Sequence, residues 1–404
     1  MTNSKYVPKR RFKEFELDGE WEQDLLGNIA DFSIKTNSFS REKLTHESYE
    51  VQNIHYGDIL IKFQSVIDLK RDNLPSIIDS SVLDFRQSLL QDGDVIFADA
   101  AEDSTVGKAI EIRNIMGKNV VSGLHTIAAR PIQLFAPYYL GYYLNSDFYH
   151  KQILPLMQGT KVSSISKSNL QVTEISFPII DEQKKIGKFF QKIASLIALH
   201  QHKLDKLKNL KKSYLAELFP AEGERVPKRR FPGFEGEWEE KKLGEMSNIT
   251  AGGDVDKDKL LTKGNYPVLA NAHTNEGIIG YYEENYQIEA PAVTVTGRGD
   301  IGFAKARKEN FTPVVRLLSI KSKHNVDFLA EAINQNKVIF ESTGVPQLTI
   351  PKLSNYKIYF PSEVDEENSI GNFLVSLDSL ITLQQHKLDK LNDLKKAYLN
   401  ELFV

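Results

Sequence analysis

Two stretches of the chain repeat the hydrophobic spacing of a coiled-coil helix. Apolar residues recur at intervals of three and four from Ile186 to Leu218, with Lys211 as the one break, and a second series runs from Ile370 to Leu402. The segments 186–219 and 370–403 align without gaps and are identical at 22 of 34 positions. The pattern predicts two long helices of one repeated kind, each on the order of 50 Å.

A second repeated block, VPKRRF, occurs at 7–12 and again at 226–231. Each copy runs on to Gly-Glu-Trp and then to Leu-Gly, and the segments between the repeats differ in sequence. A duplicated frame that holds two unlike inserts indicates one scaffold with two differently specialised domains. The predicted order is a junction (1–21), a first variable domain (22–178), a central helix (179–220), a second junction (221–238), a second variable domain (239–361) and a C-terminal helix (362–404).

The two helices are expected to pair with each other inside one chain, as an antiparallel coiled coil with pseudo-two-fold symmetry. The first junction has no helix before it and the last helix has no junction after it, so the two chain ends would complete each other. The alternative, in which the helices only dimerise the protein, remains open.

Both variable domains have the pattern of an α+β fold. In the first, the strands are expected at 58–63, 94–98 and 120–129, and the helices at 138–144 and 147–154. In the second, the strands are expected at 267–270, 292–296, 302–306 and 314–320, and the helix at 326–336. Each domain then closes with a Gly-Thr or Thr-Gly loop and a strand that ends in Phe-Pro, within 159–178 and 342–361.

Composition adds constraints on location. Hydrophobic residues make up 41% of the chain and charged residues 26%, as in a globular protein with a sizeable core. The sequence has no run of 18 apolar residues and its first residues lack the apolar stretch of a secretory signal, so no membrane partner is expected. The absence of cysteine favours the cytoplasm. A net charge of −3 argues against a small, uniformly basic DNA binder.

Motifs for catalysis or metal binding are absent from the sequence. GRGDIG at 297–302 has dinucleotide-loop spacing, but residues 303–320 favour a second strand, so a tight hairpin is the better interpretation. There is no phosphate-binding P-loop, no zinc motif, and no Asn-Pro-Pro-Tyr or Asp-Pro-Pro-Tyr of adenine methyltransferases. His200 and His202 are two apart on a helix and face different directions. No catalytic residue, metal ligand or cofactor is therefore predicted in this chain.

With these features together, the chain resembles the specificity subunit of type I restriction-modification systems over essentially its whole length. The most specific marks are FPIIDEQKKIGKFF at 177–190, its counterpart FPSEVDEENSIGNFL at 360–374, and KLxxLKxxYLxELF in each helix. The second copy has Asp-Glu-Glu at 365–367 where the first has Asp-Glu-Gln at 181–183, and one inserted residue.

The resemblance implies that the chain is a non-catalytic, DNA-binding subunit. Each variable domain would be a target recognition domain for one half of a split site in double-stranded DNA. The helices would set the spacing and dock two methyltransferase subunits, with restriction/translocase subunits completing the enzyme. S-adenosylmethionine, ATP and magnesium would belong to those partners.

Candidate DNA-binding residues are polar side chains in the loops that flank the predicted strands. They can contact base edges or phosphates. In the first domain they are Lys108, Arg113, His125, Thr126, Thr160, Lys161, Ser163, Ser164 and Lys167. In the second they are Asn271, His273, Asn275, Arg298, Lys305, Arg307, Thr343 and Gln347. Candidates for the helix seam or for partner docking are Leu204, Leu207, Lys211, Tyr214, Leu388, Leu391, Lys395 and Tyr398.

Two other interpretations remain. A coiled-coil adaptor with two protein-binding heads would have no salt-dependent DNA affinity. A nucleotide-dependent enzyme built on GRGDIG would bind its ligand through the second domain and lose it on Gly299→Val.

Overall fold

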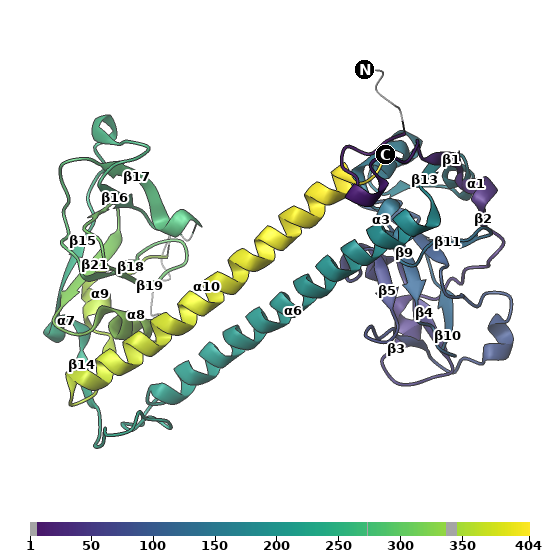
Figure 1. The fold of residues 1–404 in the computed structure, drawn as a ribbon. Coiled ribbons are helices and arrows are strands. Elements are labelled where there is room, and N and C mark those ends of the chain that lie inside the picture. The colour runs from purple at the N-terminus through teal and green to yellow at the C-terminus, as the bar shows by residue number, and fades with distance from the viewer. Residues whose placement is uncertain (1–5, 273, 337–345) are drawn as a thin grey trace. The chain divides into compact units, whose positions relative to one another are not determined.

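The computed structural model describes residues 6–272, 274–336 and 346–404. They form two compact units, one from Met1–Leu199 with Lys387–Val404 and the other from His200–His386. Each unit contains one variable domain and part of both long helices, α6 (Ile180–Leu218) and α10 (Val364–Glu401) (Figure 1).

The first unit is built on a five-stranded sheet in the order β2-β11-β7-β9-β5. A four-stranded sheet, β10-β4-β6-β3, and the pairs β1-β13 and β12-β8 complete the domain. The strands are β1 (Glu22–Leu25), β2 (Ala30–Asp31), β3 (Leu44–Thr45), β4 (Val51–Ile54), β5 (Val66–Asp68), β6 (Ser76–Ile77), β7 (Val95–Ala98), β8 (Ala100–Ala101), β9 (Ala109–Arg113), β10 (Asn119–Ser122), β11 (Thr126–Pro131), β12 (Ser163–Ser164) and β13 (Glu174–Phe177). The helices before α6 are α1 (Leu26–Ile29), α2 (Tyr56–Ile61), α3 (Tyr139–Tyr143), α4 (Asp147–Ile153) and α5 (Lys167–Gln171).

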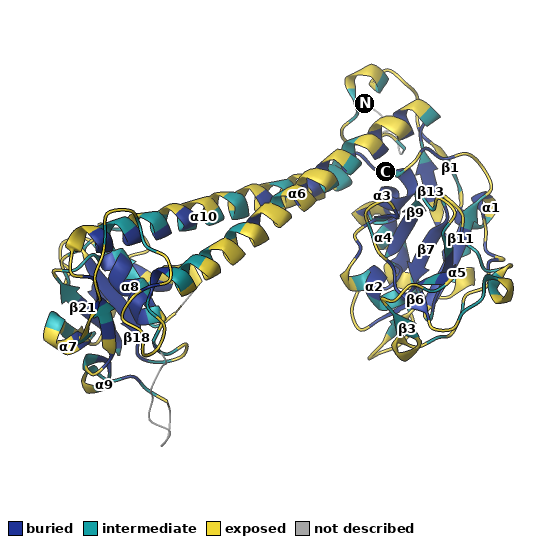
Figure 2. Ribbon diagram, turned by 90° about the horizontal axis from the view of Figure 1, so that it is seen from below, coloured by how far each residue is buried: buried dark blue, intermediate teal, exposed yellow. Residues whose placement is uncertain are grey.

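Apolar cores lie on both faces of this five-stranded sheet. One core joins aromatic residues of α3, such as Tyr139 and Tyr143, to Phe190 of α6 and Phe403 at the C-terminus. The other packs Ile96 and Ile110 under α2. Figure 2 shows the strands of the domain as mostly buried. The sheet is therefore covered by a helix on each side.

The second unit contains the sheets β15-β21-β18-β19 and β17-β16-β20 and the pair β14-β22. Its elements are β14 (Glu239–Lys242), α7 (Leu243–Met246), β15 (Ser247–Ala251), β16 (Tyr266–Leu269), β17 (Ile278–Tyr282), β18 (Ala292–Thr296), β19 (Ala304–Arg307), β20 (Thr312–Pro313), β21 (Leu317–Ser322), α8 (Val326–Asn334), α9 (Ile350–Ser354) and β22 (Lys357–Phe360). The core packs Trp238 and Phe328 against Phe219 and against Leu374 of α10.

The two long helices pair antiparallel in both units, which confirms the intramolecular pairing predicted from the repeat. In the first unit, Phe189 near the start of α6 contacts Tyr398 near the end of α10, with ring centroids 4.8 Å apart. In the second, Tyr214 near the end of α6 contacts Phe373 near the start of α10 at 4.7 Å. Phe189 and Phe373 are equivalent in the repeat, and so are Tyr214 and Tyr398. The same phenylalanine–tyrosine contact therefore occurs twice, with the roles of the two helices exchanged.

A buried arginine–glutamate pair joins each VPKRRF segment to the start of a long helix. In the first unit, Nε and Nη2 of Arg11 donate to the two carboxylate oxygens of Glu182 at 2.8 and 2.7 Å. In the second, Arg230 makes the same two bonds to Glu366 at 2.7 Å each. Both glutamates are 1% exposed and lie in the first helical turn, where the helix dipole favours a negative charge.

In the first unit, the N-terminal VPKRRF segment meets the end of α10, as the repeat predicted. Arg10 N–H donates to the C=O of Glu401 at 2.9 Å, and its side chain forms an ion pair with the Glu401 carboxylate at 2.5 Å. The second unit makes the same two contacts between Arg229 and Glu217, which are close in sequence. The end of α10 thus makes in the first unit the same two contacts that the end of α6 makes in the second.

One strand prediction in the first domain was wrong. Residues 58–63 belong largely to helix α2, which His55 caps by accepting from the N–H of Gly57 at 3.1 Å. Ile59 and Phe63, four residues apart, are buried on one face while Ile61 is 88% exposed, which is a helical pattern. Residues 120–129 are largely strand, as predicted, but they are divided into β10 and β11. At the turn between them, a Cβ on Gly123 would approach the Ile54 carbonyl oxygen to 2.7 Å.

We expect Arg11→Ala to lower the free energy of unfolding by about 3–5 kcal/mol, because Glu182 would remain buried without its partner. Arg230→Ala should act in the same way through Glu366. The midpoint of thermal unfolding, followed by circular dichroism, measures the effect. The matched control is the neighbouring Arg10→Ala, which breaks an exposed pair and should cost much less. Equal losses in the two variants would contradict the role given to the buried pair.

Candidate nucleic-acid interface

In the first domain, three loops meet at one end of the central sheet. The N–H of Asp99, just after β7, donates to the C=O of His125 at 3.1 Å, and the C=O of Asp99 accepts from the N–H of Ile165 at 2.8 Å. The Gly-Thr loop before Ile165 is a tight hairpin, with Gln158 and Ser164 exchanging backbone hydrogen bonds. This brings five sequence-predicted residues into one loop cluster, namely His125, Thr160, Lys161, Ser163 and Ser164.

His125 is the exposed aromatic side chain of this cluster. Its ring is 52% exposed, its Nδ1 lies 3.3 Å from Oδ1 of Asp99, and it packs edge-on against Tyr56 at 5.2 Å between centroids. Burial raises the pKa of the Asp99 carboxyl, and the nearby imidazole only partly offsets that effect. The carboxyl and the tyrosine ring together fix the direction of the imidazole.

The second domain builds a corresponding cluster from a different sequence. The C=O of Gly297, just after β18, accepts from the N–H of Leu348 at 3.0 Å. Asn271 joins two of the loops, since its Oδ1 accepts from the N–H of Gly297 and its Nδ2 donates to the C=O of Val315, both at 2.8 Å. The GRGDIG segment is a hairpin between β18 and β19, as predicted. The cluster contains the predicted Asn271, Arg298 and Gln347.

Arg316 also lies in this cluster, although it was not among the sequence candidates. It immediately precedes β21, and its Nη1 donates to Oε1 of Gln347. Arg316 was expected inside a strand spanning 314–320, and the candidates were chosen from loops, so it was not selected. The only signal that identifies it is its position, which matches that of His125 before β11.

A repeated asparagine contact fixes the correspondence between the two domains. The side chain of Asn145 bonds both the N–H and the C=O of Ala109, the first residue of β9. Asn334 bonds both groups of Ala304, the first residue of β19. Because β7 and β18 pair with β9 and β19 in the same register, the loops that follow β7 and β18 are also equivalent.

Four other candidates of the first domain lie outside its loop cluster or are engaged within the protein. Lys108 donates to the C=O of Leu60 at 3.0 Å, and burial lowers its pKa. Arg113 lies at the opposite end of β9 and pairs with Glu111. Thr126 is buried, and its hydroxyl donates to the C=O of Gly123. Lys167 of α5 donates to the C=O of Phe32 at 2.7 Å.

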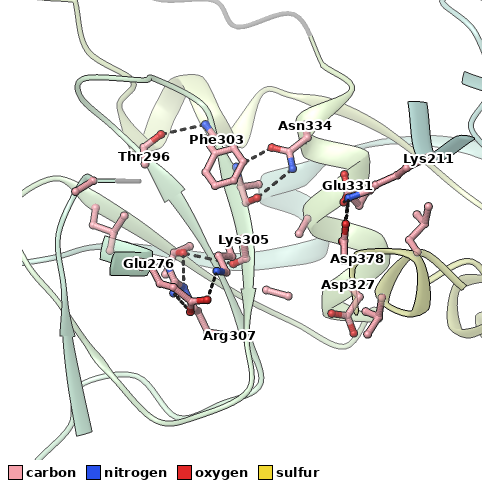
Figure 3. A pocket seen from close by; sticks show the side chains of 18 of the residues that line it. Lys211, Glu276, Thr296, Phe303, Lys305, Arg307, Asp327, Glu331, Asn334 and Asp378 are labelled. Carbon is pink, nitrogen blue, oxygen red and sulfur yellow. Dashed lines mark hydrogen bonds and ion pairs between the residues drawn. The ribbon is translucent and has the colours of Figure 1, made fainter. Parts of the chain in front are cut away.

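Lys305 and Arg307 of the second domain line a cavity of about 580 Å³ beside α8 and α10 (Figure 3). Both side chains point toward Glu276, with Lys305 Nζ at 3.0 Å from its carboxylate and Arg307 Nη2 donating to its C=O at 3.0 Å. The cations are thus already paired. Asn275 lies in the adjacent turn and donates to the C=O of Ile278 at 3.1 Å. His273 and Thr343 lie outside the described residues.

The helix candidates divide between buried and half-buried positions. Leu204 and Leu388 are buried in the pairing of the two helices. Four are half-buried, namely Leu207, Tyr214, Leu391 and Tyr398. Tyr214 and Tyr398 make the repeated aromatic contacts with Phe373 and Phe189. Packing within the chain therefore accounts for the two buried leucines and the two tyrosines.

The two equivalent lysines of the helices have opposite surroundings. Lys211 forms ion pairs with Glu331 at 2.7 Å and with Asp378 at 2.8 Å. Burial lowers its pKa, but these bonds outweigh burial and the net shift is upward. Lys395 is also buried, and its Nζ donates to Gln64 and lies over the ring of Tyr142. Burial, with a smaller contribution from Lys108, lowers the pKa of Lys395 to about 8.

Among the described residues, no three or more histidine, aspartate or glutamate side chains are grouped so as to hold a metal ion. None of the helices in that part of the chain has the length and apolar character needed to cross a membrane.

The family model described as the type I restriction modification DNA specificity domain matches the chain twice, at residues 19–209 and 235–393. A protein of Methanocaldococcus jannaschii, named as the MjaX specificity subunit of a type I restriction enzyme, is 24% identical over 96% of this chain and 94% of its own length. A Mycoplasma pneumoniae protein named as a type I specificity subunit is 28% identical over 47% of this chain, and the match spans about half of that protein, 52%.

A solved structure has a similar fold along nearly the whole chain. It is the S subunit of a type I restriction-modification system from M. genitalium, with a TM-score of 0.66 and 15% sequence identity. The match covers 98% of this chain and 99% of that one. At this identity the comparison establishes the fold.

The lowered pKa of Lys395 predicts a rise of stability with pH. The folded state holds the pKa of Lys395 near 8 against about 10.5 in the unfolded chain, so stability should rise between these values as only the folded state loses its proton. The shift corresponds to an effect on the order of 3 kcal/mol. Lys395→Met should be more stable than the parent at pH 7 and should lack this rise, as thermal unfolding from pH 7 to 10.5 would record.

The control is the equivalent substitution Lys211→Met. It should destabilise the protein at pH 7, because Glu331 and Asp378 would lose their shared cation. If both variants shifted stability in the same direction, the assignment of different surroundings would be wrong.

Proposed function

Because this chain belongs to the family of type I restriction modification DNA specificity domains, we propose that it gives a restriction-modification complex its choice of DNA sequence. Each variable domain acts as a target recognition domain and contacts one half of a bipartite site in double-stranded DNA. The observation that carries this proposal is the repeated loop cluster, formed by equivalent backbone bonds at Asp99 and Gly297 but bearing unlike side chains. One frame with two chemically different loop sets suits two different half-sites.

The chemistry of the clusters fits DNA. Lys161 and Thr160 at the tip of the Gly-Thr hairpin are exposed and suited to phosphate contact. Arg316 and Arg298 of the second cluster supply guanidinium groups, which match guanine edges in the major groove. The cluster side chains of the first domain are an imidazole, hydroxyls and one lysine. Two such unlike sets favour different base sequences at the two halves.

In this proposal the paired helices set the gap between half-sites and dock two methyltransferase subunits. Each unit carries three exposed leucines at positions that correspond under the helix repeat. In the first unit they are Leu196, Leu199 and Leu394, and in the second they are Leu380, Leu383 and Leu210. Two matching apolar surfaces suit two copies of one partner, and restriction/translocase subunits then join the complex.

The chain itself supplies sequence choice and no catalytic group. S-adenosylmethionine for adenine methylation, and ATP and magnesium for restriction, are bound by the partner subunits. The complex works in the cytoplasm, in keeping with a chain that has no cysteine.

Co-expression of this chain with its methyltransferase partner should produce adenine methylation at a split motif with two short defined halves and a fixed gap. Single-molecule sequencing of the host genome measures the motif directly. A host that expresses the methyltransferase alone is the control and should lack this motif. A soluble, assembled complex without any modification would oppose the proposal and favour the protein adaptor.

Insertion of four residues into the middle of both helices should lengthen the gap. The insertion adds about 6 Å along each helix, which corresponds to about two base pairs. The half-sites should stay the same, because the loop clusters are untouched. The same four residues inserted at the exposed turn around Met116 serve as the control and should leave the gap unchanged. An unaltered gap after the helix insertions would rule out a spacing role.

A further inference from the structure

Two residues in unlike domains share an unusual backbone conformation at equivalent places. His125 precedes β11 with φ 53°, and Arg316 precedes β21 with φ 69°. Left-handed backbone is unfavourable for residues with a Cβ, and glycine is the usual choice there. Each domain therefore keeps a side chain at a position where glycine would fold more easily. Such strain is often found at functional sites.

The surroundings of the two residues are also equivalent. The N–H of Asp99 donates to the C=O of His125, and Asp99 is itself bonded to Ile165 of the Gly-Thr loop segment. On the other domain, a Cβ on Gly297 would come within 2.3 Å of the C=O of Arg316, and Gly297 is bonded to Leu348 of the Thr-Gly loop segment. Each left-handed residue is thus fixed beside the loop that closes its domain.

Each of these side chains is oriented by an acceptor on a neighbouring loop and keeps further polar groups available. The Nδ1 of His125 faces Asp99, so its Nε2 points away from that contact. Arg316 uses Nη1 for Gln347, and a guanidinium has four more N–H donors. An oriented side chain with spare donors or acceptors is suited to a hydrogen-bonding ligand with fixed geometry.

We propose that His125 and Arg316 are the base-contacting residues at the centre of the two recognition clusters. Arg316 donates two hydrogen bonds to the O6 and N7 of a guanine, and His125 makes a single bond through Nε2 to a purine edge in the other half-site. Asp99 and Gln347 act as positioning residues that hold the imidazole and the guanidinium in place. The inference rests on the proposed function, since it assigns residues within that DNA contact.

The competing explanation is that the left-handed residues serve only the turns. In that case glycine would replace either residue without loss of sequence choice, and would even relieve backbone strain. If base contact is the reason for keeping the side chain, glycine should preserve folding and remove one element of recognition. The same substitution therefore separates the two explanations.

The experiment maps adenine methylation in cells that express the methyltransferase partner with the parent chain, with Arg316→Gly or with His125→Gly. Arg316→Gly should relax one base position in one half of the motif, with methylation of the original site reduced roughly ten- to hundred-fold in competition. His125→Gly should relax a position in the other half. Thermal midpoints of both variants should equal or exceed that of the parent.

Two further variants sharpen the result. Met116→Gly replaces another left-handed residue, with φ 49° and 72% exposure, away from the loop clusters, and should leave the motif unchanged. Arg316→Lys keeps the charge and Cβ but lacks the forked donors, and should also relax the guanine position. It tests the same contact should the glycine variant fail to assemble.

Unchanged motifs in both glycine variants, or a full parental motif in Arg316→Lys, would overturn the inference while leaving the proposed function intact. Loss of the same half in both glycine variants would overturn it as well. Failure of the proposed function would be seen separately, because the parent chain would then produce no split motif.

Discussion

Each long helix has a buried glutamate in its first turn, and in both units this charge has an arginine partner. Glu182 and Glu366 receive two parallel hydrogen bonds from Arg11 and Arg230, which come from the two copies of VPKRRF. A carboxylate this buried is tolerated only when it is paired and bonded on both oxygens. The pair therefore ties the junction segment, the start of the helix and the adjoining domain into one structure. It also explains why the chain has two copies of the junction, because each copy supplies the arginine for one helix start.

The same frame accepts very different inserts. The face of the first sheet that carries Ile96 and Ile110 is apolar and covered by α2. The register of β18 and β19 puts Thr294 and Lys305 at the corresponding places, and that face borders an open polar cavity. The domains share the face toward the long helices. Variation nevertheless reaches the long helices, because this cavity is also lined by Lys211 of α6 and Asp378 of α10. The buried arginine–glutamate pairs are kept in both units, so a variable domain can change without loss of its attachment to the helices.

The long-range organisation could be predicted from the sequence because it rests on periodicity and repetition. Seam positions such as Ile186 and Leu204 are buried as expected, and the hairpin at GRGDIG is present. Local pattern failed at 58–63, where apolar residues at neighbouring positions resemble a strand. The local cap of His55 on Gly57 and the burial of Ile59 with Phe63 decide in favour of a helix. The burial depends on tertiary contacts, which the local pattern does not show.

The candidate site was predictable only in part, for a related reason. Sequence composition identifies polar residues in loops, but it does not tell which of them are already engaged. Lys108 and Thr126 are bonded within the protein, while His125 is exposed. Arg316 was hidden in an apparently regular strand, since its left-handed backbone leaves no mark in the residues around it.

The loops themselves are held by backbone groups rather than by particular side chains. Ile165 and Leu348 each donate an N–H to the C=O at the end of a central strand, and Asn145 and Asn334 bond only main-chain atoms of their partners. Main-chain bonds of this kind survive when neighbouring side chains change. A histidine in one domain and an arginine in the other can therefore occupy one backbone position without moving the loops. Under the proposed function, the side chain that selects the DNA sequence can thus differ between domains while the same main-chain bonds keep the recognition domain folded.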